Sequence, residues 1–188
     1  MQFQEKLNKI NELQEKKKQI DKELEALLTN NSEGTTLTTT KWNVLKMKPE
    51  FTAQYLYDEC KNLFNSVTYF DDLSSTKSDR SGEYEITFEA NVEADERWKY
   101  KSAEDLAKLK DIKFITLEER LLLEIQYFKE TGKHLDIDSW TLCSGSRDHD
   151  GSVPFVSWNE NQFPVYYCNP GNANDVIRTR SAVSTCIL

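Results

Sequence analysis

Apolar side chains recur with heptad spacing at the start of the chain. Over residues 3–28 the two seam positions are Phe3, Ile10, Lys17 and Leu24, and Lys6, Leu13, Ile20 and Leu27. Neither Gly nor Pro interrupts this segment, which predicts a long helix with an apolar stripe. Such a stripe is buried either in a homo-oligomeric coiled coil or against the chain's own domain. We favour the coiled-coil stem over residues 1–28, and hence a homo-oligomer formed through residues 3–28.

The next segments are less regular. Residues 29–40 are polar and rich in turn formers, which predicts a linker. Residues 41–80 suggest a joining helical module, with a short strand at 41–47 and an amphipathic helix that is opened by Pro49 and ends near Phe64. Residues 71–82 are typical of a loop.

From Glu83 the apolar positions alternate strictly. Tyr84, Ile86 and Phe88 share one face, which predicts a half-buried strand over 83–90. Ser102 begins a short helix, and Thr116 with Glu119 forms the capping-box pattern of a longer helix that Gly132 ends.

Beyond Leu135 helical periodicity is absent. Short apolar runs at 140–143, 153–158, 163–168 and 177–183, separated by Gly, Asn, Asp or Pro, predict strands. The order of elements predicts an α+β domain over residues 81–188, with an antiparallel sheet and two helices on one side of it.

Composition narrows the classes of function. The formal charge of −8, from 24 basic and 32 acidic residues, disfavours a protein that binds nucleic-acid backbones. The sequence has no run of about 18 apolar residues and no secretory leader, so we expect a cytoplasmic protein without membrane insertion. The four cysteines are widely spaced, which favours free thiols over a disulfide framework.

Catalytic patterns are weak. His134 is expected near a helix end and His149 in a surface loop, and neither lies in a nucleophile–base motif. The acidic segments 136–138 and 148–151 lack the ligand spacing of a calcium loop, and we interpret them as turns. We therefore expect no enzymatic activity, no metal and no cofactor.

Residues 148–175 have the composition of a binding surface. Aromatic rings supply rigid contact area there, and short amides and hydroxyls supply adaptable hydrogen bonds. The candidate ligand-binding residues are Asp148, His149, Ser152, Phe155, Ser157, Asn159, Asn161, Gln162, Tyr166, Asn169, Asn172 and Asn174. An alternative interpretation assigns part of this set to core and turn positions.

Several segments resemble one known family. Residues 115–124, 127–136, 140–147, 151–154 and 177–184 resemble the C-type-lectin-fold variable proteins of diversity-generating retroelements, and the likeness covers about 83–188. The resemblance implies a C-type-lectin-like domain in which exposed variable residues, about 148–175, lie between fixed ones, and whose last residues return as a strand beside the first. The fixed set would be Gly145, Arg147, Gly151, Pro154, Trp158, Arg178 and Arg180.

The resemblance does not extend to calcium-dependent sugar binding, because Trp158-Asn159-Glu160 matches the lectin motif only weakly. The leading hypothesis is a receptor-like binder of a protein or other macromolecule. One rival is an enzyme on the related formylglycine-generating fold, with Cys143 and Cys168 as the reactive pair. Another is a structural or adaptor protein that acts through its coiled coil.

Overall fold

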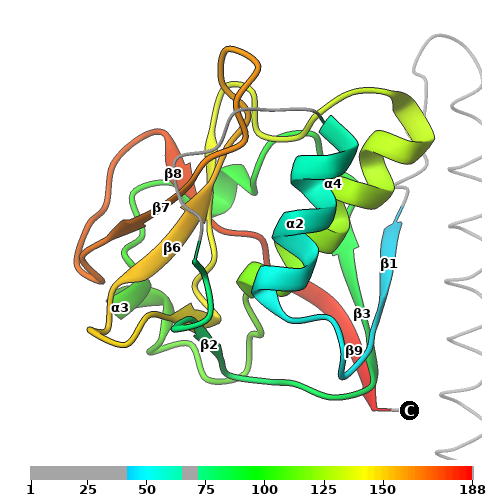
Figure 1. Ribbon diagram of the computed structural model, residues 1–188. Coiled ribbons are helices and arrows are strands. Elements are labelled where there is room, and N and C mark those ends of the chain that lie inside the picture. The colour runs from blue at the N-terminus through cyan, green and yellow to red at the C-terminus, as the bar shows by residue number, and fades with distance from the viewer. Residues whose placement is uncertain (1–41, 65–71, 188) are drawn as a thin grey trace, which may run out of the picture. The chain divides into compact units, whose positions relative to one another are not determined.

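The computed structural model describes residues 42–64 and 72–187. These residues form a mixed α+β fold with small sheets and short helices (Figure 1). The elements are β1 Trp42–Met47, α2 Ala53–Phe64, β2 Lys77–Ser78, β3 Tyr84–Glu89, the 3₁₀ helix η1 Glu96–Trp98, α3 Ala103–Leu106, α4 Leu117–Thr131, β4 Trp140–Leu142, β5 Ser146–Arg147, β6 Val153–Val156, β7 Val165–Cys168, β8 Ile177–Arg178 and β9 Ala182–Ile187. The predicted coiled coil at 3–28 and the linker at 29–40 lie outside the described residues.

A three-stranded antiparallel sheet joins both ends of the described chain. Its order is β1-β3-β9, so the last strand returns beside β3 as the resemblance implies. Tyr84, Ile86 and Phe88 are buried and their neighbours are half-buried, which confirms the predicted strand at 83–90.

The predicted strand at 177–183 is wrong as one element. The chain forms β8 in one sheet and β9 in another, with Thr179, Arg180 and Ser181 buried between them. Two of these residues bond to partners distant in sequence: the Ser181 amide donates to the Asp95 carboxylate at 3.0 Å, and Arg180 donates to the Asn91 and Val92 carbonyls. These contacts divide a sequence that has the length and composition of one strand.

Helix α4 follows its sequence signals closely. The Thr116 hydroxyl accepts from the Glu119 amide at 3.2 Å, and the Glu119 carboxylate accepts from the Thr116 amide at 2.9 Å. Gly132 ends the helix in the left-handed conformation, at φ 67°. The short helix α3 also begins as predicted, because the Ser102 hydroxyl accepts from the Asp105 amide at 3.1 Å.

Helix α2 starts later than predicted. Pro49 and Glu50 form a turn, and the helix begins at Ala53, where the Thr52 hydroxyl accepts from the Tyr55 amide at 3.2 Å. A threonine cap therefore takes the place expected for proline, because its side chain satisfies a first-turn amide.

The proposed joining module at 41–80 is not separate from the domain. Leu45 of β1 and Leu56 and Tyr57 of α2 belong to the same apolar core as Ile86 and Leu121. Figure 1 shows α2 beside α4, and the described residues from β1 to β9 belong to one compact unit. The boundary predicted near residue 81 is therefore wrong, since strand β1 completes the first sheet.

A second sheet has the order β7-β6-β4-β8. Its pairs are antiparallel except β4 with β8, which is parallel. It has its own apolar cluster, which includes Leu106, Phe114, Leu142, Val153 and Ile177. The predicted strands at 140–143, 153–158 and 163–168 thus correspond to β4, β6 and β7. Among the described helices, none is long and apolar enough to cross a membrane.

Candidate functional site

Three aromatic rings from three strands meet on the second sheet. Trp140 of β4 stacks on Phe155 of β6, with ring centroids 5.0 Å apart and planes 8° from parallel. Tyr166 of β7 lies opposite Phe155 in the strand register, and these two centroids are 5.6 Å apart. Cross-strand aromatic contacts of this kind hold neighbouring strands together and give a rigid apolar surface.

These rings line an open pocket of about 400 Å³. We call it the aromatic pocket and define it by its lining residues, which are Trp140, Phe155, Ser157, Asn159, Gln162, Pro164, Tyr166 and Tyr167. The pocket therefore combines apolar rings with hydroxyl and amide groups, a mixture suited to a ligand that is partly apolar and partly polar.

A tight turn carries two of the polar lining residues. Asn159 and Gln162 bond to each other through their backbones, at 3.0 and 2.8 Å. Glu160 and Asn161 between them both have positive φ, 46° and 63°. Two central residues of positive φ suit the right-handed twist of a hairpin. Because backbone bonds hold this turn, the side chains of Asn159 and Gln162 remain available to a ligand.

The structure brings together part of the predicted site. Phe155, Ser157, Asn159, Gln162 and Tyr166 line the aromatic pocket. The predicted exposure of two of them is wrong, because Phe155 is only 7% exposed and Ser157 only 2%. Phe155 is covered by Trp140 and Tyr166, so it contributes shape and packing more than contact area.

The remaining predicted residues lie in turns away from the pocket lining. Asp148 accepts a hydrogen bond from the Ser75 hydroxyl, and the exposed His149 lies 3.0 Å from Asp148. The Ser152 amide donates to the Asp150 carboxylate at 2.8 Å. These contacts build the 148–152 turn, in which Gly151 has φ 87°.

In the loop after β7, asparagine side chains mainly stabilise turns. The Asn169 side chain accepts from the Gly171 amide at 2.9 Å, and the Asn174 side chain accepts from the Val176 and Ile177 amides. Asn161 occupies a left-handed position that asparagine tolerates well. Asn172 is exposed, and its backbone amide donates to the Asn169 carbonyl at 2.9 Å. The alternative interpretation of turn chemistry therefore explains Asn161, Asn169 and Asn174.

The predicted list of site residues left out Trp140, Pro164 and Tyr167, which line the aromatic pocket. Trp140 precedes the segment whose composition drew attention, and it joins the pocket only because β4 pairs with β6. Tyr167 lies opposite Pro154 in the register, and its hydroxyl is 2.7 Å from that of Thr76. The signal for Trp140 was its place at the start of a predicted strand, but strand order was not predictable.

A buried ionic network anchors the sheet that carries the aromatic pocket. Asp136, expected in a surface turn, is fully buried and accepts from Arg120 of α4 at 2.8 Å and from Arg180 at 2.6 Å. It also accepts from the Thr141 hydroxyl of β4 at 2.5 Å. The interpretation of 136–138 as turn chemistry is thus wrong for Asp136, whose burial alone would raise its pKa, although Arg180 and Arg120 together lower it.

His134 extends this network instead of capping a helix. Its Nδ1 lies 2.9 Å from Oε1 of Glu124. The other carboxylate oxygen of Glu124, Oε2, accepts from Arg120 at 2.7 Å. The imidazole stacks on Trp158 with ring centroids 3.3 Å apart. Such contacts fix the ring of Trp158 against the main apolar core and leave His134 with a packing role.

Cys60, Cys143 and Cys168 are free thiols, as expected. Cys60 and Cys143 are buried, and burial raises the pKa of both thiols well above the usual range. No cluster of three or more His, Cys, Asp or Glu side chains suited to a metal occurs within residues 42–64 and 72–187.

No protein-family model matches this chain, and neither a curated protein nor a solved structure matches it.

Proposed function

We propose that this chain is a non-catalytic, receptor-like binding protein on a C-type-lectin-like scaffold. Its recognition surface is the aromatic pocket and the adjacent turn at 159–162. The observation that carries the proposal is the ring cluster of Trp140, Phe155 and Tyr166 at the base of an open pocket with amide groups around it.

The chemistry of this surface favours a protein or another macromolecule as ligand. Trp and Tyr are enriched among the residues that dominate binding energy, since they bury a large area at small conformational cost. Amide side chains at the edge, such as Asn159 and Gln162, adapt to different donors and acceptors. The resemblance of residues 115–184 to retroelement-diversified proteins supports the same assignment, because exposed positions there would vary between copies.

The enzymatic alternative is disfavoured by the state of its required nucleophile. A reactive cysteine pair needs an accessible thiolate. Cys143 is fully buried and its thiol lies 3.8 Å from the Thr141 carbonyl, while burial also raises the pKa of Cys168. Neither environment stabilises a thiolate.

Oligomerisation is part of the proposal and depends on the sequence pattern alone. A coiled coil through residues 3–28 would place several copies of the recognition surface on one stem. Linked copies bind a repetitive ligand more tightly than one copy does, without any new contact. An adaptor that acts only through the stem is the alternative, and it gives the aromatic pocket no role.

The test is whether this surface supports new binding specificities. One library randomises Asn159, Glu160 and Gln162 of the turn on the displayed full chain, and it is selected against an unrelated test protein such as lysozyme. We expect specific binders whose melting temperatures stay close to that of the parent, because Asn159 and Glu160 are exposed and Gln162 is half-buried in a turn that backbone bonds hold. Substitutions at such surface positions cost only about 0.5 kcal/mol each.

A matched library serves as the control. It randomises Tyr55, Glu59 and Lys133, which are exposed on α2 or just after α4. The proposal expects the first library to yield binders far more often than the second. Equal yields, or unfolding of most members of the first library, would show that the aromatic pocket is not a recognition surface.

A further inference from the structure

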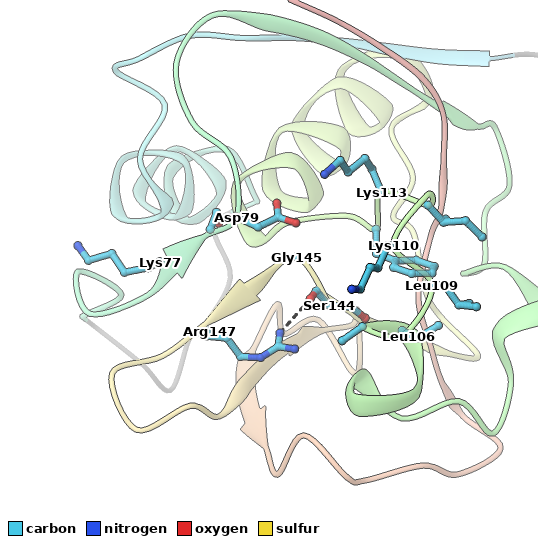
Figure 2. A pocket seen from close by; sticks show the side chains of 13 residues that line it. Lys77, Asp79, Leu106, Leu109, Lys110, Lys113, Ser144, Gly145 and Arg147 are labelled. Atoms are coloured by element: carbon cyan, nitrogen blue, oxygen red, sulfur yellow. Dashed lines mark hydrogen bonds between the residues drawn. The ribbon is translucent and has the colours of Figure 1, made fainter.

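A second pocket lies between the short β2–β5 pair and the loop after α3 (Figure 2). Its volume is about 520 Å³, and it shares no lining residue with the aromatic pocket. Strands β2 and β5 pair through Lys77 with Arg147 and Ser78 with Ser146. The loop at 106–114 forms the opposite wall.

The base of this pocket is rigid. The Gly145 amide donates to the Ile115 carbonyl at 3.0 Å, and the Gly145 carbonyl accepts from the Asp79 amide at 2.8 Å. A Cβ at position 145 would lie 2.7 Å from the Phe114 carbonyl oxygen, so only glycine fits without movement. The two walls are therefore held at a fixed separation by backbone contacts.

Basic side chains line this pocket, although Figure 2 shows Lys77 pointing away from its interior. Lys77, Lys110, Lys113 and Arg147 line it, and within residues 42–64 and 72–187 none of them forms an ion pair. The one carboxylate of the lining, Asp79, is paired with Arg80 at 2.6 Å. This is a local excess of positive charge on a chain whose formal charge is −8. Like charges placed together repel each other unless an anion joins them.

The guanidinium of Arg147 is held in a position from which it can contact an anion. Its Nη1 donates to the Ser144 carbonyl at 2.9 Å and to the Ser146 carbonyl at 2.6 Å, as Figure 2 shows for Ser144. These bonds fix the plane of the guanidinium, and no bond of its Nε or Nη2 is found among the described residues. Burial lowers the pKa of Arg147, which means that its charge is poorly solvated and gains from an anionic partner.

The wall opposite Arg147 is partly apolar. Leu106 and Phe114 are buried, Ile112 is half-buried, and Leu109 is 40% exposed beside Lys110. An inorganic ion would leave this apolar surface uncovered, whereas an organic anion would cover it while its charged group contacts the basic side chains.

We propose that this basic pocket binds a small organic anion, with a phosphate or carboxylate group between Arg147 and the lysines Lys110 and Lys113, and an apolar part against Leu106, Leu109 and Ile112. This site does not depend on the recognition function of the aromatic pocket. Charge-assisted hydrogen bonds to Arg147 supply direction, and the lysines supply further attraction.

The test is calorimetric titration of the full chain with phenyl phosphate, benzoate, inorganic phosphate and phenol at moderate salt. We expect phenyl phosphate or benzoate to bind, inorganic phosphate to bind more weakly, and phenol not to bind. The tighter of the first two identifies the anionic group. Binding should weaken as salt is added, since exposed charges are screened.

The double variant Lys110→Glu/Lys113→Glu should lower the affinity at least about tenfold, because two attractive charges become repulsive. The control Lys129→Glu/Lys133→Glu makes the same change in net charge near the C-terminal end of α4, outside the pocket lining. Melting curves establish that both variants are folded. Failure of both organic anions to bind, equal affinity for inorganic phosphate, or equal losses in the two variants would each overturn the proposal.

Discussion

Replacing Asp136 by asparagine tests the network that supports the second sheet. Asp136 is fully buried and accepts hydrogen bonds from Arg120, Arg180 and Thr141. Asparagine has nearly the same shape, but it removes the negative charge and offers an amide donor where two guanidinium groups also donate. The variant therefore leaves Arg120 and Arg180 buried with less compensation, and Arg120 already has one nitrogen without a partner.

The expected cost is large. Breaking a buried ion pair by removing one partner destabilises a protein by about 3–5 kcal/mol. For a folded unit of this size, each kcal/mol lowers the melting temperature by about 2–4 °C, so we expect a decrease of roughly 6–20 °C. Since domains are stable by about 5–15 kcal/mol, the variant should still be folded at low temperature.

The difference in stability between wild type and Asp136→Asn should depend on pH. Burial opposes ionisation of Asp136, but attraction by Arg180 and Arg120 outweighs it and places the folded-state pKa below the ordinary value of 3.8. A lowered pKa stabilises the fold above the unfolded-state value, and that stabilisation is lost as pH falls through the folded-state value. The gap in stability between wild type and variant should therefore be constant near neutral pH and narrow only below about pH 4.

Urea denaturation followed by tryptophan fluorescence measures both effects. Asp138→Asn is the matched control, because Asp138 is exposed in the same loop and loses the same charge. We expect the control to lie within about 0.5 kcal/mol of wild type. If Asp136→Asn cost less than about 1 kcal/mol, or if Asp138→Asn cost as much, the network would not hold this sheet.

Two further predictions concern packing and assembly. Trp158→Ala should lower the free energy of unfolding by about 3 kcal/mol in chemical denaturation, because it removes the ring stacked on His134. The control Tyr55→Ala, at an exposed site, should cost little. Similar losses for the two variants would contradict the packing role of Trp158. The full chain should be oligomeric in light scattering and monomeric after deletion of residues 1–34, and a strictly monomeric full chain would contradict the stem.

Local signals predicted local structure well. The alternation at Tyr84, Ile86 and Phe88 and the capping box of Thr116 and Glu119 are determined by neighbours in the sequence, and both were confirmed. The division between β8 and β9 was missed, because it depends on partners as distant in sequence as Asn91 and Asp95. The predicted domain boundary was wrong for the same reason, since β1 belongs to the domain through its pairing with β3, which is distant in the sequence.

The candidate sites could also be predicted only in part, because contacts between residues distant in the sequence form them. Composition identified Tyr166, Asn159 and Gln162, but Trp140 enters the aromatic pocket through the pairing of β4 with β6. The basic pocket had no sequence signal, because Lys110 and Arg147 lie far apart in the chain and the formal charge of −8 argued against a positive surface. Net charge describes the whole molecule, and it does not describe one pocket.

A recognition surface whose side chains vary needs supporting strands whose packing does not depend on those side chains. Trp140 lies on β4, and β4 is fixed through the hydroxyl of Thr141 to Asp136 and thus to helix α4. The turn with Asn159 and Gln162 is held instead by its own backbone bonds. A side-chain change in that turn therefore leaves the anchoring of β4 intact, so contacts at the edge of the aromatic pocket can change while its rings keep their positions.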